Sequence, residues 1–364
     1  MAVTLADVAS RAKVSSATVS RVLSGNYPVA DATRSRVLRA VDELDYVLNG
    51  PASSLAGATS HLVGILVNDI ADPFFGIIAG AAQSEIGGGL HGPGDPEKLA
   101  VVCNTGGSPE RELTYLTLLQ RQRAAAVVIT GGAAERPDHL AAVAAKLGRL
   151  AANGTRIVLC GRPPLPERFP GAGPAPAGPD TAVTLAFDNR GGARRLTEHL
   201  LALGHRRIGY VAGPADLSTT RHRLEGHRAA LSAAGLAEGA DRLTVHGPYD
   251  RASGYDATLE LLRRQPDLTA VVAANDTIAL GACAALRDQD LRIPQDVSVA
   301  GFDDLPFSAD AVPALTTVRL PLHEAGARAG RLAIGREEPP PGGVATVRAD
   351  LMARASTAPP PDRG

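Results

Sequence analysis

The sequence lacks the features of exported, membrane-bound and disulfide-stabilised proteins. No apolar run in its 364 residues approaches the roughly 20 residues that span a bilayer. Residues 1–7 hold neither a basic segment nor an apolar one, so we expect no secretory signal. Cys103, Cys160 and Cys283 are far apart and form no C-x-x-C pair, which disfavours a disulfide framework and a zinc site. These absences favour a cytoplasmic protein with reduced cysteines.

Motifs of nucleotide-binding and hydrolytic enzymes are also missing. Gly106-Gly107 follows an apolar run but fits neither G-x-G-x-x-G nor the P-loop. H-E-x-x-H and G-x-S-x-G do not occur. Asp303 and Asp304 are adjacent, and the sequence places no further carboxylate opposite them, as a sugar-modifying enzyme would need. We therefore expect no enzyme, no cofactor and no metal.

The composition nevertheless supports a large folded protein. A chain of this length predicts two to three domains, and 45% of the residues are hydrophobic, which is enough for large cores. The formal net charge of −1 provides no general attraction to nucleic acid. Any contact with DNA must therefore come from a local group of residues.

Residues 4–45 have the pattern of a small helical head. Thr4 followed by Asp7 predicts a capping box that opens a helix over residues 5–12. A tight turn leads to a second helix from Ser16, and Asp31 is expected to cap a third. Two short helices joined by such a turn are typical of a helix-turn-helix. The third helix is expected to bury a stripe of Val37, Leu38, Val41 and Leu44.

The solvent face of the second helix suits DNA. It carries short polar groups, one arginine and no acid, namely Ser16, Ala17, Thr18, Ser20 and Arg21. Short side chains allow close approach, hydroxyls reach phosphates, and an arginine can donate to both guanine O6 and N7. On spacing alone, a three-helix domain for protein contact remains the alternative.

Two segments of the head carry a specific resemblance. Residues 3–9 (VTLADVA) and 14–25 (VSSATVSRVLSG) closely resemble the head of the LacI/GalR (lactose-repressor) family of bacterial regulators. The resemblance implies a transcriptional regulator, expected to be a repressor, that acts as a homodimer on a palindromic DNA operator. The expected DNA contacts are Thr4, Ser15, Ser16, Ala17, Thr18, Ser20, Arg21, Asn26 and Leu55.

Residues 47–60 are rich in small residues and, considered alone, predict a flexible linker. In the family that the head resembles, this segment is a hinge helix that forms on operator DNA. Leu55 stands where the family wedges a leucine into the minor groove and kinks the duplex. Ser53 stands where the family often has arginine, so we expect one phosphate contact fewer.

From Leu62 onward, short apolar runs alternate with helical stretches. One series of buried strands is expected at 62–67, 99–103, 126–129 and 156–160, and a second at 183–187, 208–212, 270–274 and 297–301. Two such series predict two doubly wound parallel-sheet lobes, with ligand beyond the carboxyl ends of the strands. The predicted domains are a helix-turn-helix head (1–46), a hinge (47–60) and a two-lobed α/β core (61–364). Insertions at 87–98 and 163–179 are expected to be surface loops.

Candidate ligand residues follow the strands. Phe74 and Phe75 are two of only six phenylalanines, although packing within the lobe would also explain them. Arg223 offers a fork for hydroxyls or a carboxylate, or else begins a solvated helix. Asp276 stands at a helix start, where it would bind ligand or serve only as a cap.

The core resembles the effector domain of the same family, whose fold is shared with periplasmic sugar-binding proteins. By family position, Phe74 and Phe75 would pack on a ligand from the first lobe, and Tyr249 would stack on it from the second. Hydrogen bonds would come from Asp72, Arg162, Arg223, Asp276 and Asp303. Such a set suits a sugar, but Gly161 replaces a frequent aspartate, so no particular sugar is assigned. A transporter's solute-binding protein would share the lobes, but it would carry an export signal and no helix-turn-helix.

Overall fold

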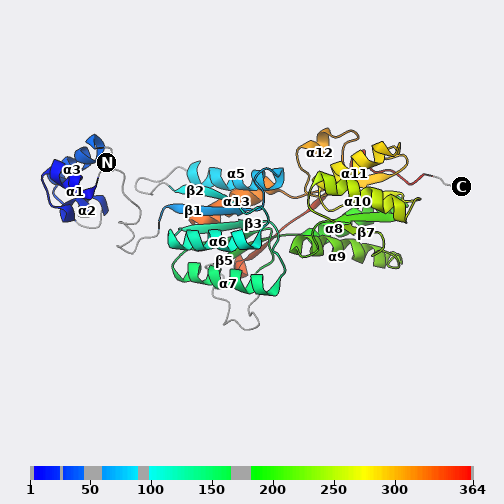
Figure 1. Cartoon of the computed structure of the whole chain (residues 1–364), viewed down its shortest axis with the longest axis horizontal. Coiled ribbons are helices and arrows are strands. Elements are labelled where there is room, and N and C mark those ends of the chain that lie inside the picture. The colour runs from blue at the N-terminus through cyan, green and yellow to red at the C-terminus, as the bar shows by residue number, and fades with distance from the viewer. Residues whose placement is uncertain (1–3, 25–27, 45–59, 89–97, 165–181, 362–364) are drawn as a thin grey trace. The chain divides into compact units, whose positions relative to one another are not determined.

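The structure is a computed structural model, and it describes residues 4–24, 28–44, 60–88, 98–164 and 182–361. The chain divides into two compact units, residues 1–60 and 61–364 (Figure 1). Asn26, Leu55 and all of the expected hinge except Ser60 lie outside the described residues, as do most of the two expected insertions. None of the described helices is long and apolar enough to cross a bilayer.

The described part of the first unit contains α1 (Leu5–Ala12), α2 (Ser16–Ser24) and α3 (Asp31–Glu43). The expected capping box is present. The Thr4 amide donates to the Asp7 carboxylate at 2.8 Å, and the Asp7 amide donates to the Thr4 hydroxyl at 3.4 Å. One small core joins the helices, formed by Val8, Ala9, Ala12, Val19, Val22, Val37 and Ala40. The predicted helix-turn-helix head is therefore confirmed.

Two predictions about α3 are wrong. Asp31 does not cap the helix but is its first residue, and the N-cap is Ala30, which has no side-chain acceptor. Leu38 is 45% exposed, whereas Ala40 is buried. The buried stripe runs through Val37, Ala40 and Val41, and Leu38 lies a further 100° or so around the helix from Val37.

Lobe 1 of the second unit is built on a parallel sheet. In the described part of the chain this sheet has six strands in the order β11-β5-β4-β3-β1-β2. The helices are α5 (Pro73–Gly88) and α13 (Leu322–Ile334) on one face, and α6 (Pro109–Arg121) and α7 (Pro137–Ala152) on the other (Figure 1). The strands are β1 (Leu62–Val67), β2 (Leu99–Asn104), β3 (Ala126–Thr130), β4 (Arg156–Cys160), β5 (Ala182–Phe187) and β11 (Val344–Val347).

Burial explains the continuous apolar runs of these strands. Ile65 and Val128 pack in the cluster that includes α5 and α13, whereas Leu66 and Val127 pack in the cluster with α6 and α7. Successive side chains of a strand point to opposite faces, and both faces of this sheet are covered. Nearly every position in the inner strands is therefore apolar.

The assignment of strands to lobes needs a correction. The run at 183–187 was expected to begin the second series, but β5 pairs in parallel with β4 in lobe 1. The short β11, which the sequence did not predict, pairs with β5 at the edge of the same sheet. An apolar run reports burial but not the identity of its neighbouring strand. The chain therefore enters lobe 2 only after Phe187.

Lobe 2 has a four-stranded parallel sheet in its described residues, in the order β7-β6-β8-β9. Its strands are β6 (Ile208–Ala212), β7 (Thr244–His246), β8 (Ala270–Ala273) and β9 (Ser298–Ala300). Helices α8 (Asn189–Ala202) and α9 (Ser218–Ala233) pack together, as do α10 (Arg251–Arg264) and α11 (Asp276–Asp288). The short α12 (Phe307–Asp310) and the antiparallel pair β10 (Thr317–Arg319) and β12 (Asp350–Met352) complete the lobe.

Glycine allows a close contact between two helices of this lobe. A Cβ on Gly226 of α9 would lie 2.1 Å from the carbonyl oxygen of Arg190 in α8. Any larger residue would push α9 away, and α9 carries Thr220 and Arg223. The predicted architecture, a helical head with a two-lobed α/β core, is confirmed.

Candidate DNA interface and ligand site

The exposed face of α2 is formed as the sequence predicted. Val19 and Val22 are buried in the head, while Ser15, Ser16, Ala17, Ser20 and Arg21 are exposed. Thr18 is half-buried, and Thr4, at the start of α1, is exposed. Residues 1–46 contain six arginine and lysine side chains against five acids, so the suitability of the head for DNA depends on the acid-free face of α2 and not on its net charge.

The turn before α2 sets the direction of that helix. Lys13 has φ 55°, in the left-handed region that side chains rarely adopt, and its amide donates back to α1. Ser15 caps α2, because its hydroxyl accepts from the Thr18 amide at 3.2 Å and lies 2.9 Å from the Thr18 hydroxyl. The Ser15 and Thr18 hydroxyls therefore hold each other at the start of the helix.

In lobe 2, a buried arginine organises the ends of the strands. Arg223 donates to Asp303 at 2.7 Å, to the Asn189 side chain at 2.8 Å and to the Ala274 carbonyl at 2.6 Å. Its guanidinium also lies 3.8 Å from the centre of the Phe302 ring. Only 2% of Arg223 is exposed, so the alternative of a solvated helix start is wrong.

Asp303, the partner of Arg223, is held in a strained backbone. Its φ is 103°, a conformation that is rare for residues other than glycine and that clusters at functional sites. Burial raises the pKa of Asp303 to about 7; Arg223 opposes this shift, whereas Asp276 and Asp72 add to it. Desolvation therefore outweighs the charge of Arg223 at this carboxyl group.

Tyr249 lies beside this pair. Its hydroxyl is 2.9 Å from the Thr220 hydroxyl, and its ring covers Gly213, where a Cβ would lie 2.3 Å from the ring. Burial raises the pKa of Tyr249, and the charges of Arg223 and Asp303 act on it. Tyr249, Thr220 and the Arg223 pair thus form one cluster in lobe 2.

The start of α5 carries the candidate ligand residues of lobe 1 that follow its first strand. Asp72 accepts from the Phe74 amide at 2.9 Å, and burial raises its pKa. The charges of Asp72 and Arg223 act on each other, so Asp72 stands near the lobe 2 cluster. Phe75 covers Gly131, where a Cβ would lie 2.6 Å from its ring. Phe74 is buried edge-on against Phe75 and Phe187, as the packing alternative expected.

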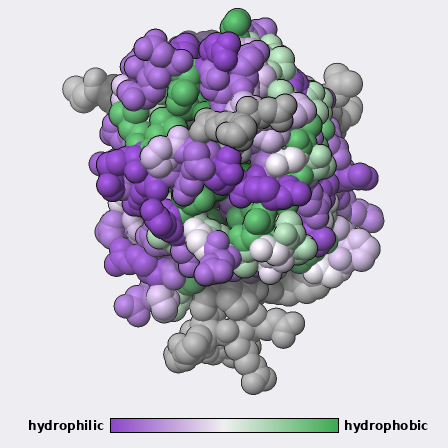
Figure 2. All heavy atoms as spheres, turned by 90° about the vertical axis from the view of Figure 1, so that its right-hand side faces the viewer, coloured by the Kyte–Doolittle hydropathy of each residue, from purple (hydrophilic) through white to green (hydrophobic). Residues whose placement is uncertain are grey.

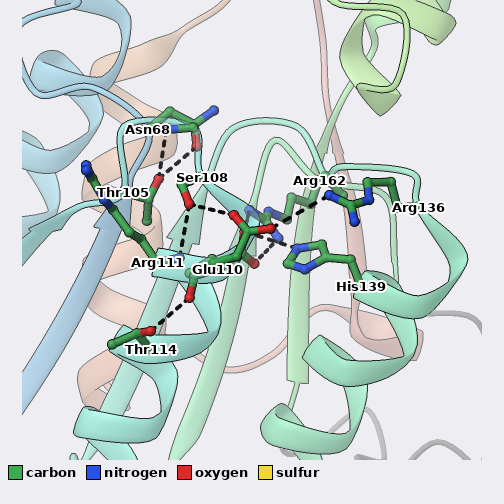
Figure 3. Close-up of polar contacts among 12 residues, drawn as sticks. Asn68, Thr105, Ser108, Glu110, Arg111, Thr114, Arg136, His139 and Arg162 are labelled. Atoms are coloured by element: carbon green, nitrogen blue, oxygen red, sulfur yellow. Dashed lines mark hydrogen bonds and ion pairs between the residues drawn. The ribbon is translucent and has the colours of Figure 1, made fainter.

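Arg162 has its partner inside lobe 1. It donates twice to Glu112 of α6, at 2.7 and 3.0 Å. His139 of α7 lies 3.8 Å from the same carboxylate, and Figure 3 shows Arg162 and His139 pointing to one place beside α6. Burial raises the pKa of Glu112, but Arg162 and His139 together lower it to about 2. The Arg162 Nε and the His139 Nε2 are buried without a hydrogen-bond partner.

Asp276 makes buried contacts that the sequence did not predict. It is fully buried, and its carboxylate accepts from the Leu305 amide at 2.8 Å, the Ser308 hydroxyl at 2.7 Å and the Thr317 hydroxyl at 2.6 Å. Burial raises its pKa to about 6. The cap of α11 is Asn275, so the prediction that Asp276 caps this helix is wrong. Asp276 holds Leu305, the start of α12 and β10 to α11.

Four neighbours of these residues were missed by the sequence reasoning: Glu112, His139, Asn189 and Thr220. Glu112 and Arg162 are 50 positions apart, and no local pattern pairs them. Asn189 follows the Asp188 cap of α8 and gave no signal beyond that of a helix start. Among the described residues, no group of three or more His, Cys, Asp or Glu is placed to hold a metal ion.

Comparisons with known proteins agree with this arrangement. Residues 4–49 match the model of "Bacterial regulatory proteins, lacI family", and residues 197–357 match that of a "Periplasmic binding protein-like domain". The chain is 34% identical to the transcriptional regulator GalR of Escherichia coli (strain K12), over 91% of this chain and 88% of that protein.

Two solved structures are similar along the whole chain. A complex of the transcriptional regulator CelR with cellobiose has 32% identity and a TM-score of 0.65, covering 97% of this chain and 99% of that one. A lac repressor dimer bound to operator and the anti-inducer ONPF has 27% identity and a TM-score of 0.71, covering 98% and 100%.

Proposed function

The chain belongs to the lacI family of bacterial regulatory proteins, and from this we propose that it acts as a homodimeric repressor on a palindromic operator, controlled by a sugar bound between its lobes. DNA binding and control by a ligand follow from the family. The operator symmetry, the dimer and the sugar are the proposal. The observation that carries it is an exposed, acid-free α2 face in the same chain as a two-lobed core with polar clusters at its strand ends.

For the DNA contacts, we propose that the exposed residues of α2 read the major groove. Arg21 would donate to a guanine, and the hydroxyls of Ser15, Ser16 and Ser20 would reach phosphates. Asn26 and the wedge at Leu55 belong to the same proposal. Because one head reads one half-site, a palindrome requires two heads related by a two-fold axis.

For the effector, the residues proposed to contact it are those that the sequence predicted, namely Asp72, Phe74, Phe75, Arg162, Arg223, Tyr249, Asp276 and Asp303. Together they offer an aromatic face on each side with hydroxyl, carboxylate and guanidinium groups, which suits a sugar ring. Each arginine is already paired with a carboxyl group, Arg162 with Glu112 and Arg223 with Asp303. Because neither guanidinium is left to hold a phosphate group, the proposed effector is an uncharged sugar rather than a sugar phosphate.

The homodimer proposal is supported by exposed apolar residues in both lobes of the core. Leu99 and Val101 lie on the edge strand β2, with 64% and 38% exposure, and Val312 in lobe 2 is 89% exposed. In Figure 1, β2 and α5 of lobe 1 and α11 and α12 of lobe 2 lie along one long side of the core. The end of the core that faces the viewer in Figure 2 is mostly hydrophilic, with apolar residues in separate areas. An exposed edge strand with apolar residues is a site for pairing with another chain.

Effector binding would act through lobe closure. Closing the lobes over a sugar would move the two lobe 1 regions of the dimer relative to each other and change the spacing of the hinges. Such coupling is typically worth about 1–3 kcal/mol, or 5- to 150-fold in operator affinity. Sugar binding and operator binding should therefore depend on each other reciprocally.

The test is selection of bound sequences from random duplex DNA by the purified protein, with and without a panel of neutral sugars and their phosphates. We expect a palindrome with a flexible central step, and one neutral sugar that changes its recovery. Arg21→Ala should cost about 1–3 kcal/mol and relax the preference at one base pair, whereas Leu55→Ala should reduce DNA bending. Selection of no sequence over non-specific binding would refute the proposal.

A further inference from the structure

The two lobes touch through a short non-covalent seam beside the proposed effector site. We define this seam as residues 133–135, after β3 in lobe 1, and residues 216–221, around the start of α9 in lobe 2. Ala134 and Leu217 form an antiparallel bridge. The Ser218 amide donates to the Ala133 carbonyl at 2.9 Å, and the Glu135 amide donates to the Asp216 carbonyl at 2.7 Å.

An ion pair reinforces this backbone contact. Arg221 donates to both oxygens of Glu135, at 2.7 and 2.6 Å, so the pair is bidentate across the lobes. Both side chains are only partly exposed. Arg221 also pairs with Glu225 one turn later in α9, and Glu225 accepts from Arg190 of α8. These last two pairs lie within lobe 2, and only the pair with Glu135 crosses to lobe 1.

The seam is continuous with residues of the proposed effector site. Ser218 begins α9, and Thr220, which contacts Tyr249, and Arg223, which holds Asp303, follow within two turns. The fit between the loops is close, because a Cβ on Gly132 would lie 2.5 Å from the Thr219 hydroxyl. The seam and these groups therefore share the first turns of α9.

The chain itself also connects the lobes. The chain crosses between β5 and α8, between β10 and α13, and between β11 and β12. These crossings act as hinges and persist when the lobes open, whereas the seam must break. We propose that Glu135 and Arg221 are positioning residues that hold the lobes closed over the effector site and so set the fraction of closed protein. The part of this proposal that concerns the effector rests on the proposed function.

The expected effect of removing the ion pair on opening of the seam follows from the solvent exposure of the pair. Partly exposed ion pairs contribute up to about 1 kcal/mol, and a bidentate arginine–carboxylate pair lies at the upper end. Removing it should therefore increase opening of the seam about fivefold, which matches 1 kcal/mol at 25 °C. The seam should open without a change in global unfolding, since the core of each lobe is untouched.

The experiment is amide hydrogen exchange of the full chain, without DNA or sugar. In Glu135→Gln and in Arg221→Gln, we expect the amides of Ser218 and residue 135 to exchange about fivefold faster, with other regions unchanged. The double variant should exchange no faster than either single one, since both remove the same pair. Glu225→Gln is the matched control, because it breaks the pairs inside lobe 2 and leaves the pair with Glu135.

Two results would overturn the inference: unchanged exchange at the seam in both single variants, or equal acceleration in Glu225→Gln.

A second readout separates a positioning role from a simple contribution to stability. A panel sugar that binds between the lobes should slow exchange of the same two seam amides in the wild type and in Glu135→Gln, because the seam opens only when the lobes open; a local contact unrelated to closure would exchange equally fast with and without sugar. Because exchange needs neither DNA nor sugar, the seam can fail while the regulator proposal holds. Conversely, if the variants show the expected faster exchange but the protein selects no DNA sequence, the seam proposal holds and only the regulator proposal fails.

Discussion

The two lobes each bury an arginine–carboxylate pair near the proposed effector site, and the two pairs have opposite electrostatics. In lobe 1, Arg162 and His139 overcome the effect of burial, and the pKa of Glu112 is lowered to about 2. In lobe 2, burial outweighs Arg223, and the pKa of Asp303 is raised to about 7. Both carboxylates are almost fully buried, so burial alone does not explain the difference.

The neighbours of each ion pair explain the difference between the two carboxyl pKa values. Glu112 receives both hydrogen bonds of a fork and has a histidine as its next ionisable neighbour. Asp303 receives one hydrogen bond from Arg223, whose other nitrogens serve Asn189 and Ala274, and its next charged neighbours are the acids Asp276 and Asp72. A buried arginine–carboxylate pair therefore accompanies a lowered carboxyl pKa in one lobe and a raised carboxyl pKa in the other.

The largest effect is expected from Arg223→Ala. This change leaves buried acceptors on Asp303, Asn189 and Ala274 without a donor, and it removes the contact with Phe302. We expect a loss of about 5 kcal/mol in the free energy of unfolding, measured by urea denaturation at pH 7. Arg194→Ala, which breaks an exposed pair with Glu198, should cost less than about 1 kcal/mol. A similar small loss for Arg223→Ala would show that lobe 2 does not depend on this arginine.

Glu112→Gln should cost about 3 kcal/mol at pH 7, because the Arg162 charge then stays buried without its counter-charge. The pKa of Glu112 is lower in the folded state than its ordinary 4.5. Its contribution is therefore complete above pH 4.5 and is lost as the pH falls toward 2. Urea denaturation from pH 7 to pH 3 should show the difference between wild type and variant constant at first and then shrinking. A difference that grows on acidification would contradict the lowered pKa.

Asp303→Asn should behave in the opposite way. The folded state holds a proton on Asp303 up to about pH 7, whereas the unfolded chain releases it near 3.8. Wild-type stability therefore falls with rising pH between these values, by up to about 1.4 kcal/mol per pH unit from this group. Asparagine keeps an oxygen for Arg223 and has no such slope, so its stability relative to wild type should rise from pH 4 to pH 7. Parallel stability curves for the two proteins would refute the raised pKa of Asp303.

Local patterns predicted much of the molecule. The Thr4–Asp7 capping box, the exposed face of α2 and the buried strands of both lobes depend on residues close in sequence. The errors arose where a second element decides the outcome. The run at 183–187 joined the sheet of lobe 1, and Leu38 faced solvent, because partners in space select the strand neighbour and the buried stripe.

The sequence by itself determined the helical head, the alternation of strands and helices, and most of the residues at the strand ends, because helix caps and hydrophobic periodicity act over a few positions. Only the tertiary structure decided what those residues touch. It joined Arg162 to Glu112, Arg223 to Asp303, and Asp276 to Ser308 and Thr317. Charge compensation and desolvation depend on distance in space, so the protonation of these acids and the seam at Glu135 are properties of the folded core.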